Sequence, residues 1–273
     1  MSKEWSEYLK EIDDAWNTLP QSALEARFLE IDARVKADYG SDSGVYGAMR
    51  NEIGAFYKGE GRFSEAEACF GQAVDIFQSE TGKESSAYAT ALNNLAGTHR
   101  LMGETDKAET EFMSCLELYA ATVGRNHVLY AAGLNNLSLC CLDKGDFSQA
   151  AELLRRASDI LSGLPDRWDE LAVSLINLGC LYQRLGRLDE ADEKLTQALR
   201  MFREKLGTDT PHYHAALNGL GAVHYAQKRF KEAVSDFTAA AEAARLMYGP
   251  DHYEVKAAEQ HAEAARKAEG KRS

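Results

Sequence analysis

The stretch NLGCLYQRLGRLDEADEKLTQAL, residues 177–199, contains the pattern from which the fold can be predicted. Its apolar residues recur every three or four positions on both sides of Gly186, which is the spacing of an amphipathic helix. The glycine therefore indicates a short turn between two helices. Equivalent turns occur at GRF (Gly61), GET (Gly103), GDF (Gly145) and KRF (Lys228), so that the five turns follow at steps of 42, 42, 41 and 42 residues. Self-similarity at a fixed period of this length is typical of repeat proteins.

Positions at a fixed distance from each turn hold the same kind of residue. Five residues after the turn the residue is always alanine: Ala66, Ala108, Ala150, Ala191 and Ala233. Nine residues after it the residue is aromatic or leucine: Phe70, Phe112, Leu154, Leu195 and Phe237. Small residues let the two helices of a pair approach closely, and the larger ones fill the space between them. Neither helix can bury its apolar face alone, so neighbouring pairs must stack.

We therefore expect an all-α solenoid of stacked antiparallel helix pairs, about thirteen helices in one continuous domain. Five repeats occupy residues 44–253, between a degenerate capping helix pair at 1–43 and a polar capping helix and tail at 254–273. The second helices are predicted to end at a left-handed glycine, at Gly82, Gly124, Gly207 and Gly249. The third repeat has GLPDRW (163–168) at this place instead, so its geometry is expected to differ.

Composition excludes several classes of function. The formal net charge of −12 argues against nucleic acid and against anionic membrane surfaces as partners. Five cysteines at scattered spacings predict a reducing, cytoplasmic location and small core residues, not disulfides. His212 and His214 lack a clear third ligand, so we predict no metal, and no motif indicates a cofactor or a catalytic site. The protein is predicted not to be an enzyme.

The pattern Leu-Gly-x-x-Tyr, then a glycine turn, then alanine, resembles the tetratricopeptide repeat. The period of 42 residues is similar to that of kinesin light chains, as are ALNNLAG (91–97), GLNNLSL (133–139), GRNHVLYA (124–131) and GPDHYEV (249–255). The resemblance is strong over residues 44–255. It implies a right-handed superhelix whose concave face is lined by the first helix of each pair, and a role in binding other proteins.

Asparagines fill two columns that this resemblance places on the concave face. Seven of the ten positions lying ten or nine residues before a turn are asparagine: Asn51, Asn93, Asn94, Asn135, Asn136, Asn177 and Asn218. Because an amide both donates and accepts hydrogen bonds, a ladder of them is suited to gripping the backbone of an extended peptide. The alternative is that they bridge neighbouring first helices, which is a purely structural role.

Three basic residues near these columns, Lys58, Arg100 and Arg184, are candidates to bind an acidic side chain of a partner, although lone charges of this kind are more often simply solvated. The main hypothesis is an interaction module that captures a segment of another protein in its groove. The alternative is a regulatory subunit or self-assembling scaffold that acts through its convex or terminal surfaces. A homo-oligomer formed through Trp5 and Trp16 would belong to this second hypothesis.

Overall fold

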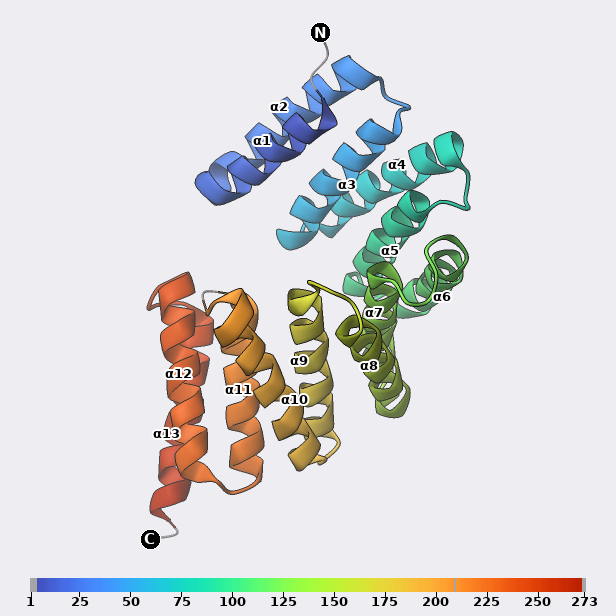
Figure 1. Cartoon of the computed structure of the whole chain (residues 1–273). Helices are drawn as coiled ribbons and strands as arrows, with labels where there is room; N and C mark the ends of the chain where they lie inside the picture. Colours follow the sequence, from blue (N-terminus) through green and yellow to red (C-terminus); the bar gives the residue numbers. More distant parts are fainter. Residues whose placement is uncertain (1–3, 209, 272–273) are drawn as a thin grey trace. The chain divides into compact units, whose positions relative to one another are not determined.

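The computed structural model describes residues 4–208 and 210–271, and every regular element in these ranges is a helix. The chain forms two compact units, Met1–Arg125 and Asn126–Ser273. Figure 1 shows helix pairs joined by short turns in each unit. The prediction of an all-α helical-repeat solenoid is confirmed.

The N-terminal unit holds three helix pairs. Their helices are α1 (Trp5–Thr18), α2 (Gln21–Tyr39), α3 (Gly44–Gly59), α4 (Phe63–Thr81), α5 (Ser86–Leu101) and α6 (Thr105–Thr122). Each helix packs against the next one along the chain. Trp16 of α1 packs its ring against Phe28 and Phe56, with ring centroids 5.2 and 5.9 Å away. Trp5 also packs against this core, so both tryptophans proposed for dimerisation already have contacts within the unit.

The C-terminal unit holds three further pairs and a last single helix. Its elements are α7 (Val128–Asp143), α8 (Phe147–Ser162), α9 (Trp168–Arg184), α10 (Leu188–Met201), the π-helical segment η1 (Phe202–Leu206), α11 (Pro211–Ala226), α12 (Phe230–Tyr248) and α13 (Tyr253–Gly270). The last helix packs along α12 and buries Val255, Ala258, Ala262 and Ala265. Within the described ranges, no helix is both long and apolar enough to cross a membrane.

The column nine residues after each turn forms the centre of the core. Phe70, Phe112, Leu154, Leu195 and Phe237 are between 0% and 4% exposed. They face a column of small residues on the first helix, and there the space is fully used. A methyl group added at Gly221 would lie 2.8 Å from the ring of Phe237, and one at Gly54 would lie 2.7 Å from that of Phe70. The repeated small residues therefore set how closely the two helices of a pair approach.

The five predicted turns share one geometry. After α3, the amide of Gly61 donates to the carbonyl of Lys58, and the amide of Arg62 donates to that of Tyr57. This pair of bonds is a Schellman motif, which requires a left-handed residue at its centre. Four of the turns place a glycine there; the fifth places Lys228, with a φ of +64°.

The longer loops that join one pair to the next also follow the sequence. Gly82, Gly124, Gly207 and Gly249 have φ between +76° and +88°, as predicted. At the start of the next helix, the side chain of the N-cap residue accepts a hydrogen bond from a backbone N–H of the first turn. The N-cap residues that do so are Ser43, Ser85, His127, Thr210 and His252. The histidines of GRNH and GPDH are thus helix N-caps. The loop after α8 differs, because Asp166 takes the left-handed conformation there and Arg167 provides no side-chain cap.

Candidate functional site

Every residue predicted to form the binding site lies on the first helix of its pair. The placement is Asn51 and Lys58 on α3, Asn93, Asn94 and Arg100 on α5, Asn135 and Asn136 on α7, Asn177 and Arg184 on α9, and Asn218 on α11. The seven asparagines are buried or half-buried. A buried amide needs hydrogen-bond partners, so the contacts of each asparagine decide what it can still bind.

Several asparagines bridge successive first helices. Three contacts do this: Asn94 Nδ2 donates to Asn51 Oδ1 at 2.9 Å, Ser174 Oγ donates to Asn135 Oδ1 at 3.1 Å, and His261 Nδ1 lies 3.1 Å from Asn218 Oδ1. Each contact joins one repeat to the next within a unit. A bridge of this kind contributes about 1 kcal/mol to stability. At these positions the asparagines therefore bridge neighbouring first helices, which is the structural role given above as the alternative to binding a peptide.

Asparagines of α7 and α9 also surround a cavity, which we call the asparagine pocket. It has a volume of about 430 Å³ and is lined by Val128, Ala132, Asn135, Asn136, Leu139, Leu161, Asp169, Glu170, Val173, Asn177 and His212. Aliphatic side chains thus combine with three amides and two carboxyl groups. Asn177 forms no side-chain hydrogen bond within the described part of the chain. Its amide is therefore available to a ligand.

An equivalent but smaller cavity lies between α3 and α5 of the N-terminal unit. It has a volume of about 250 Å³ and is lined by Ala48, Asn51, Glu52, Phe77, Ser86, Ala87, Thr90 and Ala91. Ala48 and Thr90 occupy the same register, thirteen residues before a turn, as Ala132 and Val173 of the asparagine pocket. Burial, and to a lesser degree the charge of Asp13, raises the pKa of Glu52. The same positions of the repeat therefore form a hollow in each unit.

The three basic candidates differ in their surroundings. Burial, followed by the positive charge of Arg100, lowers the pKa of Lys58, whose Nζ lies 5.5 Å from the ring centroid of Phe70. The positive charge of Arg100 on α5 therefore acts on Lys58 of α3, the preceding first helix. Arg184 is instead stacked on the ring of Phe147, with Cζ 4.6 Å from the centroid, and it does not line the asparagine pocket. Cation–π stacking accounts for this arginine.

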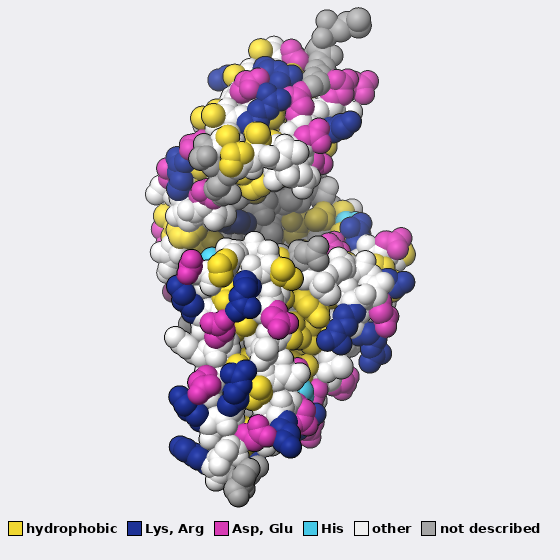
Figure 2. Space-filling model, turned by 90° about the vertical axis from the view of Figure 1, so that its left-hand side faces the viewer, with side chains coloured by type: hydrophobic (Ala, Val, Ile, Leu, Met, Phe, Trp, Pro, Cys, Tyr) yellow, Lys and Arg dark blue, Asp and Glu magenta, His cyan; other side chains and the backbone are white. Residues whose placement is uncertain are grey.

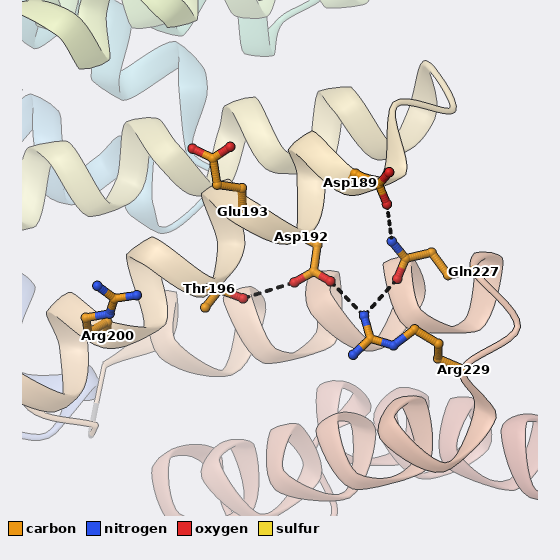
Figure 3. A pocket seen from close by; sticks show the side chains of 7 residues that line it. All are labelled: Asp189, Asp192, Glu193, Thr196, Arg200, Gln227 and Arg229. Atoms are coloured by element: carbon orange, nitrogen blue, oxygen red, sulfur yellow. Dashed lines mark hydrogen bonds and ion pairs between the residues drawn. The ribbon is translucent and has the colours of Figure 1, made fainter.

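Another cavity, of about 610 Å³, lies along the second helix α10 and the turn before α12. Figure 3 shows that several of its polar side chains contact one another: Arg229 Nη1 lies 2.8 Å from Asp192 Oδ2 and 3.1 Å from Gln227 Oε1. Gln227 in turn donates to Asp189 at 3.0 Å. On the face drawn in Figure 2, Lys and Arg side chains alternate with Asp and Glu. Because Asp189, Asp192, Gln227 and Arg229 already pair with one another, this cavity is a weaker candidate than the asparagine pocket.

Comparison with known families identifies the repeat. Two models described as Tetratricopeptide repeat match residues 46–121 and 88–163, and residues 176–247. The chain belongs to the tetratricopeptide repeat family. A model of Anaphase-promoting complex subunit 5 also matches residues 137–210. Tetratricopeptide repeats form extended surfaces that bind other proteins, so the chain is a protein–protein interaction module of this family.

Solved structures share the fold at low sequence identity. BtubC (BKLC) from P. vanneervenii is 20% identical, with a TM-score of 0.64 over 90% of this chain and 91% of that one. The TPR-like repeats of a Podosopora anserina chain assigned as a kinesin light chain are 21% identical, with a TM-score of 0.59 over 72% and 93%. A tetratricopeptide repeat sensor protein of the STAND class from Pyrococcus horikoshii is 15% identical, with a TM-score of 0.69 over 89% of this chain and 34% of that one. No curated protein matches the chain. At the level of the fold, the prediction of kinesin light chain-like tetratricopeptide repeats is confirmed.

Sequence reasoning missed part of the asparagine pocket. Asp169 and Glu170 lie in the first turn of α9, where acidic residues are expected in any helix because they complement its dipole. His212 lies in the first turn of α11, at a position that is not part of the asparagine columns. The aliphatic part of the lining could have been found from the register of Ala132 and Val173, which lie one helical turn before the asparagines of the same helices.

Proposed function

We propose that this tetratricopeptide repeat protein captures an extended segment of a partner protein along the concave face formed by its first helices, with asparagine amides holding the backbone of the segment. The observation that carries the proposal is the asparagine pocket. Three amides from two successive first helices, α7 and α9, line it next to aliphatic side chains. Ligand sites commonly combine an apolar surface with a few convergent polar groups.

The contacts divide the asparagines into two roles. Four asparagines use one side-chain atom in a hydrogen bond to a neighbouring helix: Asn51, Asn94, Asn135 and Asn218. Replacing any of them is therefore expected to reduce the stability of the fold as well as binding. Asn177 has no such bond within the described residues, so it is the position at which binding can be tested without weakening the scaffold. An amide that donates to a peptide carbonyl and accepts from a peptide N–H would serve partners of many sequences.

The test uses the full chain against a display library of random peptides, followed by affinity measurements on the selected peptides. Asn177→Ala is expected to weaken their binding by about tenfold, the equivalent of one or two hydrogen bonds, with an unchanged unfolding midpoint. Asn17→Ala, an exposed position on α1, is the matched control and is expected to change neither. Selection of no peptide, or equal affinities for the wild type and Asn177→Ala, would contradict the proposal.

The alternative of a scaffold that self-associates through its terminal surfaces has one observation in its favour. At the junction of α12 and α13, Leu246 is 90% exposed and Tyr253 is 70% exposed. Apolar side chains left in water at the end of a repeat array are candidates for contact with another chain. A molecular mass that rises with protein concentration in light scattering, and that Leu246→Glu returns to that of the monomer, would favour this alternative.

A further inference from the structure

The acidic side of the asparagine pocket contains a carboxylate oxygen without a partner. Glu170 accepts from Arg167 Nη1 through Oε1 at 3.3 Å. Its other oxygen, Oε2, is buried and has no hydrogen bond within the described part of the chain. Asp169, the neighbouring residue, lines the same pocket. A buried polar atom without a partner costs about 1–3 kcal/mol, so this oxygen calls for a physical explanation.

In the equivalent acidic pair one helix later, each carboxyl group has a partner and the glutamate is contacted through both of its oxygens. Asp189 and Glu190 occupy the first turn of α10, as Asp169 and Glu170 do in α9. Glu190 Oε2 accepts from Arg187 Nε at 2.6 Å, and Asp189 accepts from Gln227. Position at a helix N-terminus therefore does not by itself leave a carboxylate unpaired. Both glutamates contact the arginine three residues before them, but Arg187 contacts both oxygens of Glu190, whereas Arg167 contacts only Oε1 of Glu170. The pocket that Glu170 lines contains no lysine or arginine for its second oxygen.

The rest of the pocket limits which group can pair with Glu170 Oε2. Aliphatic side chains, among them Val128, Ala132 and Val173, form part of the same lining as the carboxyl groups and the amides. A bare hydrated cation would gain nothing from them. Lysine and arginine, in contrast, bury an aliphatic stem along an apolar surface while the charged end stays with polar groups. The net charge of −12 also favours the approach of a positively charged partner.

We infer that the asparagine pocket receives a lysine or arginine side chain of the captured partner segment, with its stem on the aliphatic lining and its charged end at Asp169 and Glu170. This inference rests on the proposed function, since it assumes that a segment is held by the asparagines. It adds a chemical class to the partner: at the position that faces the pocket, the segment is basic.

Burial, and after it the hydrogen bond with the adjacent Asp169 carboxyl, raises the pKa of Glu170, and the positive charge of Arg167 offsets this only in part. The Glu170 side chain is 32% exposed, so solvent screening limits how strongly it can attract a charge. An effect of about tenfold on affinity, not of many orders of magnitude, is therefore expected when the basic side chain is replaced.

The experiment uses four short peptides that differ only at a central residue, which is lysine, arginine, norleucine or glutamate. Each is titrated into the full chain, and binding is followed through the methyl resonances of Val128 and Val173. The lysine and arginine peptides are expected to shift both resonances and to bind about tenfold more tightly than the norleucine peptide. Equal affinities of the lysine and norleucine peptides would overturn the inference and leave the proposed function standing. If none of the peptides bound, the proposed function itself would be contradicted.

Variants then locate the effect. Glu170→Gln combined with Asp169→Asn is expected to remove the preference for lysine over norleucine, and Asp189→Asn with Glu190→Gln, the matched acidic pair of α10, is expected to keep it. Glu170→Lys is expected to reverse the preference, so that the glutamate peptide binds more tightly than the lysine peptide. A lysine preference that survives in Glu170→Lys overturns the inference. N-acetyl-lysine methylamide is the final probe: binding as tight as that of the peptide would mean a site for a free amine and would also overturn it.

Discussion

Lys228 occupies the turn position that is glycine in the four other repeats. Its φ of +64° lies in the left-handed region, which the four other turns fill with glycine. An L-residue in this conformation is strained by roughly 1 kcal/mol. Lys228→Gly is therefore expected to stabilise the C-terminal unit by about 1 kcal/mol, measured as a rise in the urea unfolding midpoint.

The matched control for this prediction is Lys231→Gly, three residues later in α12. Its side chain is 84% exposed, with one ion contact at 4.0 Å to Glu269. In the first turn of α12 the same substitution relieves no backbone strain and is expected to destabilise slightly, because glycine is a poor helix former. If both variants were destabilised to the same extent, the strain assigned to Lys228 would be refuted.

At this scale the sequence was a good guide to backbone conformation and a poor one to side-chain contacts. The period alone placed Lys228 in a glycine column, and the structure gives it the conformation of a glycine. The asparagine columns were equally visible, but the contact of Asn135 with Ser174 joins residues 39 positions apart. Whether such an amide bridges two helices or stays available to a ligand depends on distances of a few tenths of an ångström. A residue pattern does not contain those distances.

The close approach of paired helices leads to a prediction at the level of the element. Alanine is a better helix former than glycine by about 1 kcal/mol, so Gly221→Ala in α11 would stabilise an isolated helix. In the protein, the added methyl group would lie 2.8 Å from the ring of Phe237, which is 4% exposed. The clash is expected to prevail, with a net loss of about 1–3 kcal/mol measured by urea unfolding.

Gly97→Ala provides the opposite case on α5. A methyl group there meets nothing within 4 Å, so only helix propensity acts and a gain of up to about 1 kcal/mol is expected. Opposite signs for two identical substitutions would identify the helix–helix distance as the cause. Stabilisation by Gly221→Ala would mean that the pair can separate without loss, and the explanation of the small-residue column would then be wrong.

Element boundaries followed from local chemistry wherever a glycine marked them. The exception is the connection from α8 to α9, where GLPDRW replaces the usual glycine and Asp166 adopts a φ of +54°. The sequence predicted that this loop would differ but not how, because asparagine, aspartate and glycine can each take the left-handed conformation. The same loop leads into the first turn of α9, which carries Asp169 and Glu170. The part of the candidate site that sequence reasoning missed therefore follows the one irregular loop.

Across the whole molecule, each unit contains one buried histidine that joins successive second helices. In the N-terminal unit, His99 Nδ1 lies 2.6 Å from Glu111 and Nε2 lies 3.2 Å from Glu67. In the C-terminal unit, His224 lies in the same register of the repeat, four residues before the turn. Its Nδ1 is 2.5 Å from Asp236 and its Nε2 is 3.3 Å from Asp192.

Stability should therefore depend on pH in a way that the family fold alone does not predict. Burial by itself would lower the pKa of His224, but the hydrogen bond and charge of Asp236 outweigh it, and the pKa is raised. A histidine whose pKa is higher in the folded state stabilises fully below its unfolded pKa of about 6.5, and loses this contribution as the pH rises through the folded value. His214 acts in the opposite sense: burial lowers its pKa, so its contribution is lost as the pH falls.

Because the pKa of His224 is raised and that of His214 is lowered, the variant His224→Gln tests the contribution of His224 alone. The variant loses packing at every pH, but it loses the charged contact with Asp236 only where the histidine is protonated. Its thermal midpoint is therefore expected to lie further below that of the wild type at about pH 5.5 than at about pH 8.5. Asp236→Asn removes the carboxylate that raises the pKa of His224, so its thermal midpoint is expected to show the same pH dependence. The double variant His224→Gln with Asp236→Asn is expected to show no pH dependence beyond that of either single variant. A deficit that stays constant with pH would mean that His224 is neutral in the folded protein and that the link between second helices depends on packing instead of charge.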